Sequence, residues 1–467
     1  MAKYEIVGGV GIIPKGVTAI GDYAFFDCTS LTSVEIPSSV TEIGNSVFEG
    51  CSSLTSIVVE EGNSVYDSRE GCNAIIETAT NKLIRGCNST IIPSSVTEIG
   101  RSAFYGCTSL ASIEIPSSVT KIEYGAFDGC TSLTSIVVKE GNSVFDSREG
   151  CNAIIETATN TLIKGCNSTI IPSNVTMIGE SAFQDCTSLT SIVIPESVTK
   201  IEYGAFDGCT SLTSVVIPEG VTTIGVRTFD GCTSLTSVVI PSSVTAIGFR
   251  TFSYCSSLTS IVIPESVTEI GGGAFADCTS LTSVVISSSV TEIGKNAFPG
   301  CASLTSIIVE EGNSVYDSRE GCNAIIETAT NKLIQGCNST IIPSSVTEIG
   351  YKAFYGHTSL TSIEIPSSVK MIGWDAFINC TSLTSVAING KIKKIDRGTF
   401  RGCTALESIT LPPGVNKIEW DAFEGCTSIK VINVPAKKYD YYYERIPSPF
   451  NSLIVEMEPV KKAKKKK

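Results

Sequence analysis

The sequence predicts a β-rich solenoid, a stack of short coils that each contribute two strands. Three observations predict this fold class. A phenylalanine recurs at a fixed interval through most of the 467 residues. The apolar residues between these phenylalanines alternate, as they do in strands. One interval is also too short to bury its own apolar face, so it needs similar neighbours above and below.

The phenylalanines set the register of the repeat. Ten of the thirteen steps between them are 23 residues, and the other three are 56, which is one repeat and 33 further residues. Fourteen units, three of them followed by an insertion at residues 60–92, 139–171 or 310–342, therefore account for almost the whole chain. The marker phenylalanines are Phe25, Phe48, Phe104, Phe127, Phe183, Phe206, Phe229, Phe252, Phe275, Phe298, Phe354, Phe377, Phe400 and Phe423.

Two short strands are predicted within each unit. In one unit, Leu235, Val238 and Ile240 form the inward set of the first strand, and Val244 and Ile247 that of the second. Stacked at ~4.8 Å per coil, each strand pairs with the copies above and below it. Half a dozen buried aliphatic side chains per coil, at ~1.5–3 kcal/mol each, offset the ordering entropy only when those neighbours are present.

The corner that carries the phenylalanine is short, so it allows no more than one helical or 3₁₀ turn. Ten units have Gly directly after the second strand, which makes a left-handed conformation convenient there. It is not obligatory, because four units have an acidic residue instead. These residues are Glu123, Glu202, Asp396 and Glu419.

The unit L-x-x-I-x-I-P-x-x-V-x-x-I-G-x-x-A-F-x-x-C resembles that of the BspA-like (Treponema-type) leucine-rich repeats, over roughly residues 12–436. The resemblance implies a right-handed leucine-rich-repeat solenoid, used for adhesion and protein binding. The end INVPAKKYDYYYERIP, followed by SLIVEMEP, is similar to the closing strand and short helix of that family. The predicted organisation is a cap strand region at 1–20, the repeat array at 21–436, a capping helix and strand at 437–460, and a basic disordered tail at 461–467.

The three insertions are nearly identical and predict β-hairpins. In the first, the runs NAIIET and NKLIRG flank a turn at Ala79 and Thr80. A hairpin centred there places Cys72 opposite Cys87, and opposite residues on antiparallel strands lie ~4.5–5.5 Å apart, inside the range of a disulfide. The sequence does not decide whether such pairs are bonded. The same register pairs Cys151 with Cys166 and Cys322 with Cys337.

Thirteen further cysteines lie three residues after a marker phenylalanine, from Cys28 to Cys426, and His357 occupies the fourteenth slot. Parallel stacking keeps their Cβ atoms ~4.8 Å apart, beyond the usual ~3.5–4.5 Å of a disulfide. We therefore predict free, buried thiols that pack as small hydrophobic residues. His357, the only histidine, has no matched base and acid in the pattern. No metal, cofactor or enzyme motif is recognised.

The composition restricts the partners and the compartment. A net charge of −13 argues against a nucleic-acid-binding face, which needs clustered Lys and Arg. No apolar run approaches the ~18 residues that span a bilayer, and the start of the chain as written carries no export signal. Together with the many thiols, these features predict a cytoplasmic protein, favoured as a monomer. A cell-surface or secreted location is the alternative that the resemblance implies.

Two surfaces are candidates for a partner. The first is an outward column on the first strand, which either forms an apolar groove or reflects only β-propensity on an exposed sheet. The second is the variable column three residues before the marker phenylalanine, where aromatic residues either bind a partner or cap their own coil. The first column contains Val193, Val216, Val239, Val262 and Val285. The second contains Tyr124, Tyr203, Phe249, Tyr351, Trp374 and Trp420.

These features together predict a non-enzymatic scaffold for protein–protein recognition that uses no cofactor. The resemblance implies adhesion to host or cell-surface proteins, as for a surface antigen. The alternative is an intracellular structural or assembly scaffold, which the thiols favour. Of the two candidate surfaces, we expect the variable column around Tyr351, Trp374 and Trp420 to carry specificity, because it differs at nearly every coil.

Overall fold

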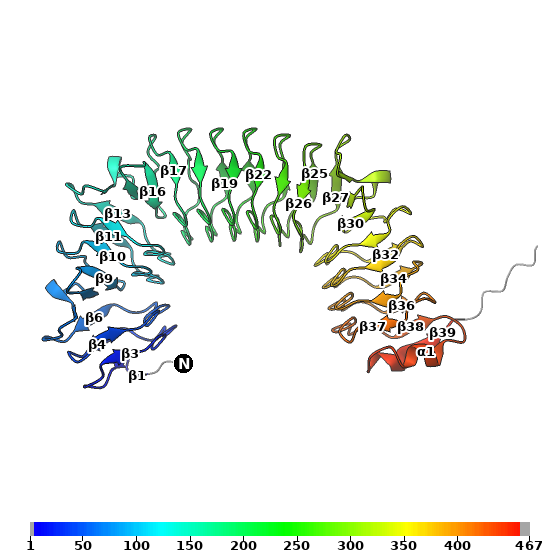
Figure 1. Ribbon diagram of the computed structural model, residues 1–467, viewed down its shortest axis with the longest axis horizontal. Coiled ribbons are helices and arrows are strands. Elements are labelled where there is room, and N and C mark those ends of the chain that lie inside the picture. The colour runs from blue at the N-terminus through cyan, green and yellow to red at the C-terminus, as the bar shows by residue number, and fades with distance from the viewer. Residues whose placement is uncertain (1–3, 458–467) are drawn as a thin grey trace, which may run out of the picture. The chain divides into compact units, whose positions relative to one another are not determined.

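The computed structural model describes residues 4–457 and divides the chain into two compact units, which meet in sequence at Leu235 and Thr236. Each unit is a stack of coils with almost no helix (Figure 1). The predicted β-rich solenoid is therefore confirmed. The predicted basic tail, residues 461–467, lies outside the described residues.

Regular coils contribute two strands, and within an uninterrupted run of coils each strand pairs in parallel with the same strand of the next coil; one coil has only an isolated bridge at Ser191 in place of its first strand. In the second unit, β25 pairs with β27 so that Ser283 lies opposite Ser306. In the second sheet, Glu269 of β24 lies opposite Glu292 of β26. Both offsets equal one repeat, as the sequence predicts.

The strands have the following bounds. The first strands are β4 (Ser33–Ile36), β6 (Ser56–Val59), β11 (Ser112–Ile115), β13 (Ser135–Val138), β19 (Ser214–Val216), β21 (Ser237–Val239), β23 (Ser260–Ile261), β25 (Ser283–Ile286), β27 (Ser306–Val309), β32 (Ser362–Ile365), β34 (Ser385–Ile388), β36 (Ser408–Thr410) and β38 (Val431–Val434). The second strands are β3 (Ala19–Ile20), β5 (Glu42–Ile43), β10 (Glu98–Ile99), β12 (Lys121–Ile122), β17 (Met177–Ile178), β18 (Lys200–Ile201), β20 (Thr223–Ile224), β22 (Ala246–Ile247), β24 (Glu269–Ile270), β26 (Glu292–Ile293), β31 (Glu348–Ile349), β33 (Met371–Ile372), β35 (Lys394–Ile395) and β37 (Lys417–Ile418).

The insertions and the two ends add further elements. The insertions form β7 (Tyr66–Asp67), η1 (Arg69–Gly71), β8 (Ile75–Glu77) and β9 (Lys82–Arg85); β14 (Phe145–Asp146), η2 (Arg148–Gly150), β15 (Ile154–Glu156) and β16 (Thr161–Lys164); and β28 (Tyr316–Asp317), η3 (Arg319–Gly321), β29 (Ile325–Glu327) and β30 (Lys332–Gln335). The ends form β1 (Glu5–Val7), β2 (Val10–Ile12), α1 (Tyr439–Tyr443), η4 (Phe450–Leu453) and β39 (Ile454–Glu456).

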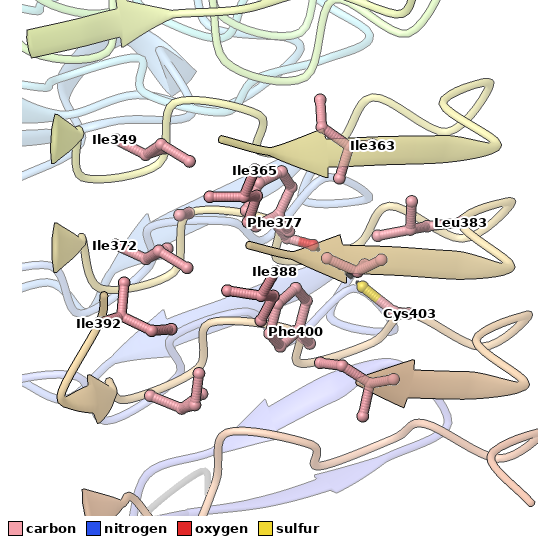
Figure 2. Packing of buried hydrophobic residues seen from close by; sticks show 14 of the residues in the cluster. Ile349, Ile363, Ile365, Ile372, Phe377, Leu383, Ile388, Ile392, Phe400 and Cys403 are labelled. Carbon is pink, nitrogen blue, oxygen red and sulfur yellow. Dashed lines mark hydrogen bonds between the residues drawn. The ribbon is translucent and has the colours of Figure 1, made fainter. Parts of the chain in front are cut away.

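The marker phenylalanines form the centre of the core. The rings of Phe275 and Phe298 stack with centroids 5.1 Å apart, within the 4.5–7 Å range that aromatic pairs favour. Figure 2 shows Phe377 and Phe400 in the same arrangement, among aliphatic side chains from both strands of each coil. Such stacking joins the rings of coils that follow one another directly, which is why one coil cannot fold alone.

The corners are runs of turns closed by hydrogen bonds three residues apart. The Cys232 N–H donates to Phe229 O (3.2 Å), and the Leu235 N–H to Cys232 O (3.0 Å). The 3₁₀ helices η1, η2 and η3 lie in the insertions instead. The corners are therefore as short as predicted.

The glycines after the second strand have a different role from the predicted one. Gly271 and Gly294 do not have a positive φ. Instead, a Cβ atom on Gly294 would lie 2.2 Å from the backbone nitrogen of Gly272 in the preceding coil. Close approach of successive backbones, and not a left-handed conformation, therefore explains glycine at this position. The left-handed residues lie nearer the phenylalanine, as at Lys352 (φ 54°) and Asp375 (φ 53°).

The predicted hairpin of each insertion is confirmed. In the first, Glu77 of β8 pairs with Lys82 of β9, and β7 adds a third antiparallel strand. β9 also pairs in parallel with β10, so it serves as the second strand of an additional, abbreviated coil. Gly86 replaces a marker phenylalanine in this coil, because a Cβ there would lie 2.3 Å from the ring of Phe104.

The predicted pairing of the insertion cysteines is wrong in register. A bulge between Ile75 and Ile76 pairs Ile75 with Arg85, so Cys72 no longer lies directly opposite Cys87. Both thiols are free, and they pack into different hydrophobic clusters. The same bulge occurs in the other two insertions, between Cys151 and Cys166 and between Cys322 and Cys337.

Both ends of the chain carry closing elements. At the first, β1 and β2 form an antiparallel hairpin that pairs with β4. At the other, β39 pairs in parallel with β38, beside α1. Tyr442 of α1 is buried and its hydroxyl donates to Pro412 O (2.7 Å). These elements cover the apolar faces that the first and last coils would otherwise expose.

Candidate partner-binding surfaces

The thiols three residues after each marker phenylalanine are free, and all except Cys28 are buried. Where two regular coils follow one another, the thiol donates to the carbonyl of the preceding phenylalanine, as from Cys301 Sγ to Phe275 O (3.2 Å). Burial raises the pKa of the Cys51 thiol to about 12, so the nucleophilic thiolate is disfavoured. Cys28 is half-buried because its coil packs on the short N-terminal hairpin.

His357 is buried within the same column. Its Nε2 lies 3.3 Å from Nε2 of Gln335, and burial lowers its pKa to about 4, so the ring is neutral at pH 7. The ring packs edge-on against Phe354, with centroids 6.4 Å apart. A side chain without solvent exposure cannot meet a substrate, so His357 acts as a packing residue.

The six aromatic residues of the variable column are all exposed. Tyr124 and Tyr203 lie on the first unit and the other four on the second. The structure brings two of these four together: Tyr351 and Trp374 line one cleft of about 700 Å³. Phe249 and Trp420 lie elsewhere on the second unit.

The third insertion creates this cleft by wedging two coils apart. The corner of one coil ends at Gly300, whose N–H donates to Tyr355 O in the next corner (2.8 Å), so the two corners touch there. At the other end of the same corners, the strands of the insertion separate Lys295 from Tyr351. The second sheet therefore breaks after β26, and the cleft opens at that break.

The insertion also satisfies the strand edge that the break leaves. The hydroxyl of Tyr316, on β28, accepts a hydrogen bond from the N–H of Ile293 (3.0 Å). Ile293 is the last residue of β26, so this bond replaces a missing strand partner. Tyr316 thereby forms part of the cleft wall and holds β28 against β26.

Aromatic rings and cations form the rim of the cleft. Tyr351 and Trp374 occupy the same position in consecutive coils, and their side chains are 42% and 59% exposed. The ammonium of Lys352 lies 5.3 Å from the centroid of Tyr351 and 5.1 Å from that of Tyr355, a cation–π arrangement. The rings therefore offer flat apolar faces beside positive charge.

The charges of the cleft are mostly positive. Four lining residues are basic, namely Lys295, Lys332, Arg397 and Arg401, and two are acidic, namely Glu327 and Asp375. Lys332 pairs with Glu348 (2.6 Å), Arg401 with Asp375 (3.8 Å) and Arg397 with Asp421 (3.1 Å). Lys295 is exposed and has no ion pair within residues 4–457.

Four successive members of the variable column line the cleft: Lys295, Tyr351, Trp374 and Arg397. From the sequence, only the two aromatic members were predicted to contact a partner. Lys332 and Tyr316 were missed because the insertions were treated as hairpins apart from the array. A signal was present in the sequence: the run NKLI of the hairpin has the same alternation as VTEI of the next second strand. The two runs pair in parallel, with Leu333 opposite Ile349.

The outward column of the first strand is also exposed, and it is longer than predicted. The most exposed of the five predicted valines are Val193 (82%) on the first unit and Val262 (79%) on the second. The insertions add apolar residues to this column, with Ile91 76% exposed and Ile170 and Ile341 both 75% exposed. The string STIIP places these isoleucines in the valine column, directly before the Ile-Pro of the repeat.

A family model described as BspA type leucine rich repeat region matches most of the chain. The matched residues are 11–74, 75–164, 154–255, 245–332 and 325–444. No curated protein matches the chain. No helix among the described residues is long and apolar enough to cross a membrane.

Solved structures of bacterial leucine-rich repeat proteins are similar to this chain. A leucine rich cell surface protein from Faecalibacterium prausnitzii A2-165 is 26% identical, with 85% of this chain and 94% of that chain covered and a TM-score of 0.48. A leucine-rich repeat protein from Bacteroides ovatus ATCC 8483 is 28% identical, with 84% and 98% covered and a TM-score of 0.43. The leucine rich repeat protein of T. pallidum is 30% identical, with 42% and 78% covered and a TM-score of 0.30.

Proposed function

The chain belongs to the family of BspA-type leucine-rich repeat proteins, and on this premise we propose that it is a non-enzymatic scaffold that recognises a protein partner. The cleft at the third insertion supports this proposal most directly. It combines two exposed aromatic side chains, Tyr351 and Trp374, with arginines, which are the residue types enriched at binding hot spots.

The shape of the cleft fits a macromolecular segment better than a small molecule. Its wall draws residues from several coils, and its rim holds exposed rings rather than an enclosed apolar pocket. A partner that follows the stack could contact Lys295, Tyr351, Trp374 and Arg397 in turn. Because these four positions differ in side chain, contacts along them can distinguish one partner from another.

The apolar column of the first strand is a second candidate surface. Exposed branched residues in consecutive coils, such as Val262 and Val285, form an apolar stripe of the kind that marks interaction sites. This stripe is uniform, so it would bind with little sequence choice. We assign recognition to the cleft and a supporting role to the stripe.

The test compares two tryptophans of the variable column. Trp374→Ala removes a ring from the cleft, whereas Trp420→Ala removes a similarly exposed ring outside it. Circular dichroism first checks that both variants are folded. We then expect the amount of partner captured by the immobilised protein to fall about tenfold or more for Trp374→Ala and little for Trp420→Ala. Equal loss in both, or loss only in Val239→Glu, would move the site away from the cleft.

The setting of this recognition is the finer part of the proposal. We infer adhesion to a cell-surface or host protein as the primary role, and an intracellular assembly scaffold as the alternative. Labelling intact source cells with a membrane-impermeant amine reagent, followed by fractionation, separates the two. Labelled protein in the surface fraction supports adhesion, and unlabelled protein confined to the cytosol supports the assembly scaffold.

A further inference from the structure

The two clefts beside the second and third insertions occupy equivalent places but differ in charge. The smaller cleft, about 190 Å³, is lined by three acidic side chains, Glu123, Asp128 and Glu180, and by one basic side chain, Lys164. The larger cleft has four basic and two acidic lining residues. The local charge is thus reversed, in a chain whose net charge is −13.

Part of this positive charge is left unneutralised by the chain itself. At the first insertion, Lys82 contacts two carboxylates, Glu98 (2.8 Å) and Glu123 (2.9 Å). At the third insertion the equivalent Lys332 contacts Glu348, and Gly373 stands where Glu123 stands. The carboxylate that would complete the pair is missing from this sequence position, so an outside carboxylate can take its place.

The rim adds two further cations. Lys295 is exposed and has no ion pair in the described part of the chain. Arg397 bonds Asp421 through its Nε, and its side chain remains 66% exposed. A guanidinium has five N–H donors, so Arg397 can bind a second carboxylate without losing the first.

The dimensions of the rim suit an extended segment. Lys295, Tyr351, Trp374 and Arg397 belong to successive regular coils, which stack at ~4.8 Å and are spread further by the insertion. The rim is therefore at least roughly 15 Å long, which an extended peptide covers with about five residues. The rings of Tyr351 and Trp374 offer apolar contact to the peptide between its charges.

From this charge, length and arrangement we propose that the cleft binds an extended peptide segment carrying several acidic side chains. The inference rests on the proposed function and specifies the chemistry of the partner. Carboxylates of the segment would contact Lys295, Lys332 and Arg397, while its backbone and aliphatic stems lie on the two rings. The complementary charges would speed association and favour acidic over neutral sequences.

The test uses a fluorescein-labelled peptide of about nine residues in which Glu alternates with Ser, with Gln and Lys versions as controls. Fluorescence anisotropy with the full chain should show the Glu peptide bound about tenfold more tightly than the Gln peptide, with weaker binding as salt rises. Lys295→Glu should remove about tenfold of that affinity. Lys370→Glu, an exposed lysine outside the cleft, should change it little.

Each result distinguishes the inference from the function on which it rests. Equal binding of the Glu and Gln peptides, or equal loss in Lys295→Glu and Lys370→Glu, overturns the acidic-peptide proposal. A single-stranded oligonucleotide of equal charge that binds as tightly as the Glu peptide also overturns it, because it shows unspecific attraction of anions. If the peptide tests overturn the proposal but Trp374→Ala still reduces the amount of partner captured, the proposed protein recognition stands. Only the proposed acidic chemistry of the partner is then wrong.

Discussion

The second and third insertions have almost the same sequence and the same hairpin, yet the clefts beside them differ in size and charge. In both, the strand pairing contains a bulge at the same place, at Ile154 and at Ile325. The cleft measures about 190 Å³ beside the second insertion and about 700 Å³ beside the third. The insertion therefore provides the opening, and the residues of the neighbouring coils decide what the opening can bind.

The two insertions also differ at one buried polar position. Lys164 is buried at the second, donates to Ser181 O and Gln184 O (both 3.3 Å), and lies 3.8 Å from Asp128. Gln335 is buried at the third and donates to Gly336 O (2.9 Å) and Ala353 O (3.2 Å). The cation has a carboxylate beside it, whereas the amide needs none.

The adjacent column changes together with this position. A cysteine, Cys186, lies beside Lys164, whereas His357 contacts Gln335. A neutral imidazole nitrogen can accept a hydrogen bond from the amide of Gln335, so the two substitutions suit one another. His357 is therefore explained by its neighbour, and its uniqueness in the sequence does not indicate chemistry.

The largest expected effect comes from making the third insertion resemble the second at this position alone. Gln335→Lys buries a cation where Pro299 replaces the carboxylate of Asp128, so the charge has no partner. We expect a loss of about 3–5 kcal/mol in the free energy of unfolding, measured by urea titration. Gln335→Met, which adds no charge, is the control and should cost clearly less. Equal losses in both variants would show that packing, not charge, distinguishes the two insertions.

A smaller effect is expected from the histidine and depends on pH. The pKa of His357 is about 4 in the folded chain and about 6.5 when unfolded, so the unfolded state binds more protons between these values. The free energy of unfolding is therefore highest above pH 6.5, and it falls by about 3 kcal/mol as the pH decreases towards 4. His357→Cys gives the third insertion the column residue of the second and should remove this loss.

Comparing the wild type with His357→Cys at pH 7 and pH 4 isolates the histidine, because every carboxylate is common to both chains. At pH 7 the two should be nearly equal in stability, since the ring is neutral in both folded and unfolded chains. At pH 4 the cysteine variant should be the more stable. A constant difference at both pH values would contradict the low pKa of His357.

The sequence predicts the periodic parts of the molecule well, because each unit repeats the same local requirement. Spacing of Phe275 and Phe298 sets the register, and the alternation around Leu235 sets the strands. The hairpin turn at Ala79 and Thr80 is equally local. These features follow from residues near one another in sequence, or from one repeat length.

The cleft could not be predicted in the same way, because it depends on the position of a wedge. Lys295 and Tyr351 are 56 residues apart, and their separation follows from three strands that enter between the coils. The bulge that displaces Cys72 from Cys87 leaves no mark in the alternation of Ile75 and Ile76, since both are apolar and buried. Long-range packing, and not propensity, decides both.

The smallest expected effect distinguishes the first insertion from the third through one lysine. Lys82 contacts Glu98 and Glu123 and joins Lys121 in a network of four charges, whereas Lys332 pairs with Glu348 alone among the carboxylates of the described residues. Networks stabilise more than single pairs, which contribute up to about 1 kcal/mol near the surface.

We therefore expect Lys82→Met to lower the free energy of unfolding by about 1 kcal/mol and Lys332→Met by less than about half of that. Urea titrations of both variants at low salt, with each repeated at high salt, measure the difference. Salt should reduce the loss at Lys82, because the network is electrostatic. Similar losses at both sites would mean that Lys332 is already fully neutralised within the fold, and that it is not held ready for a carboxylate from outside.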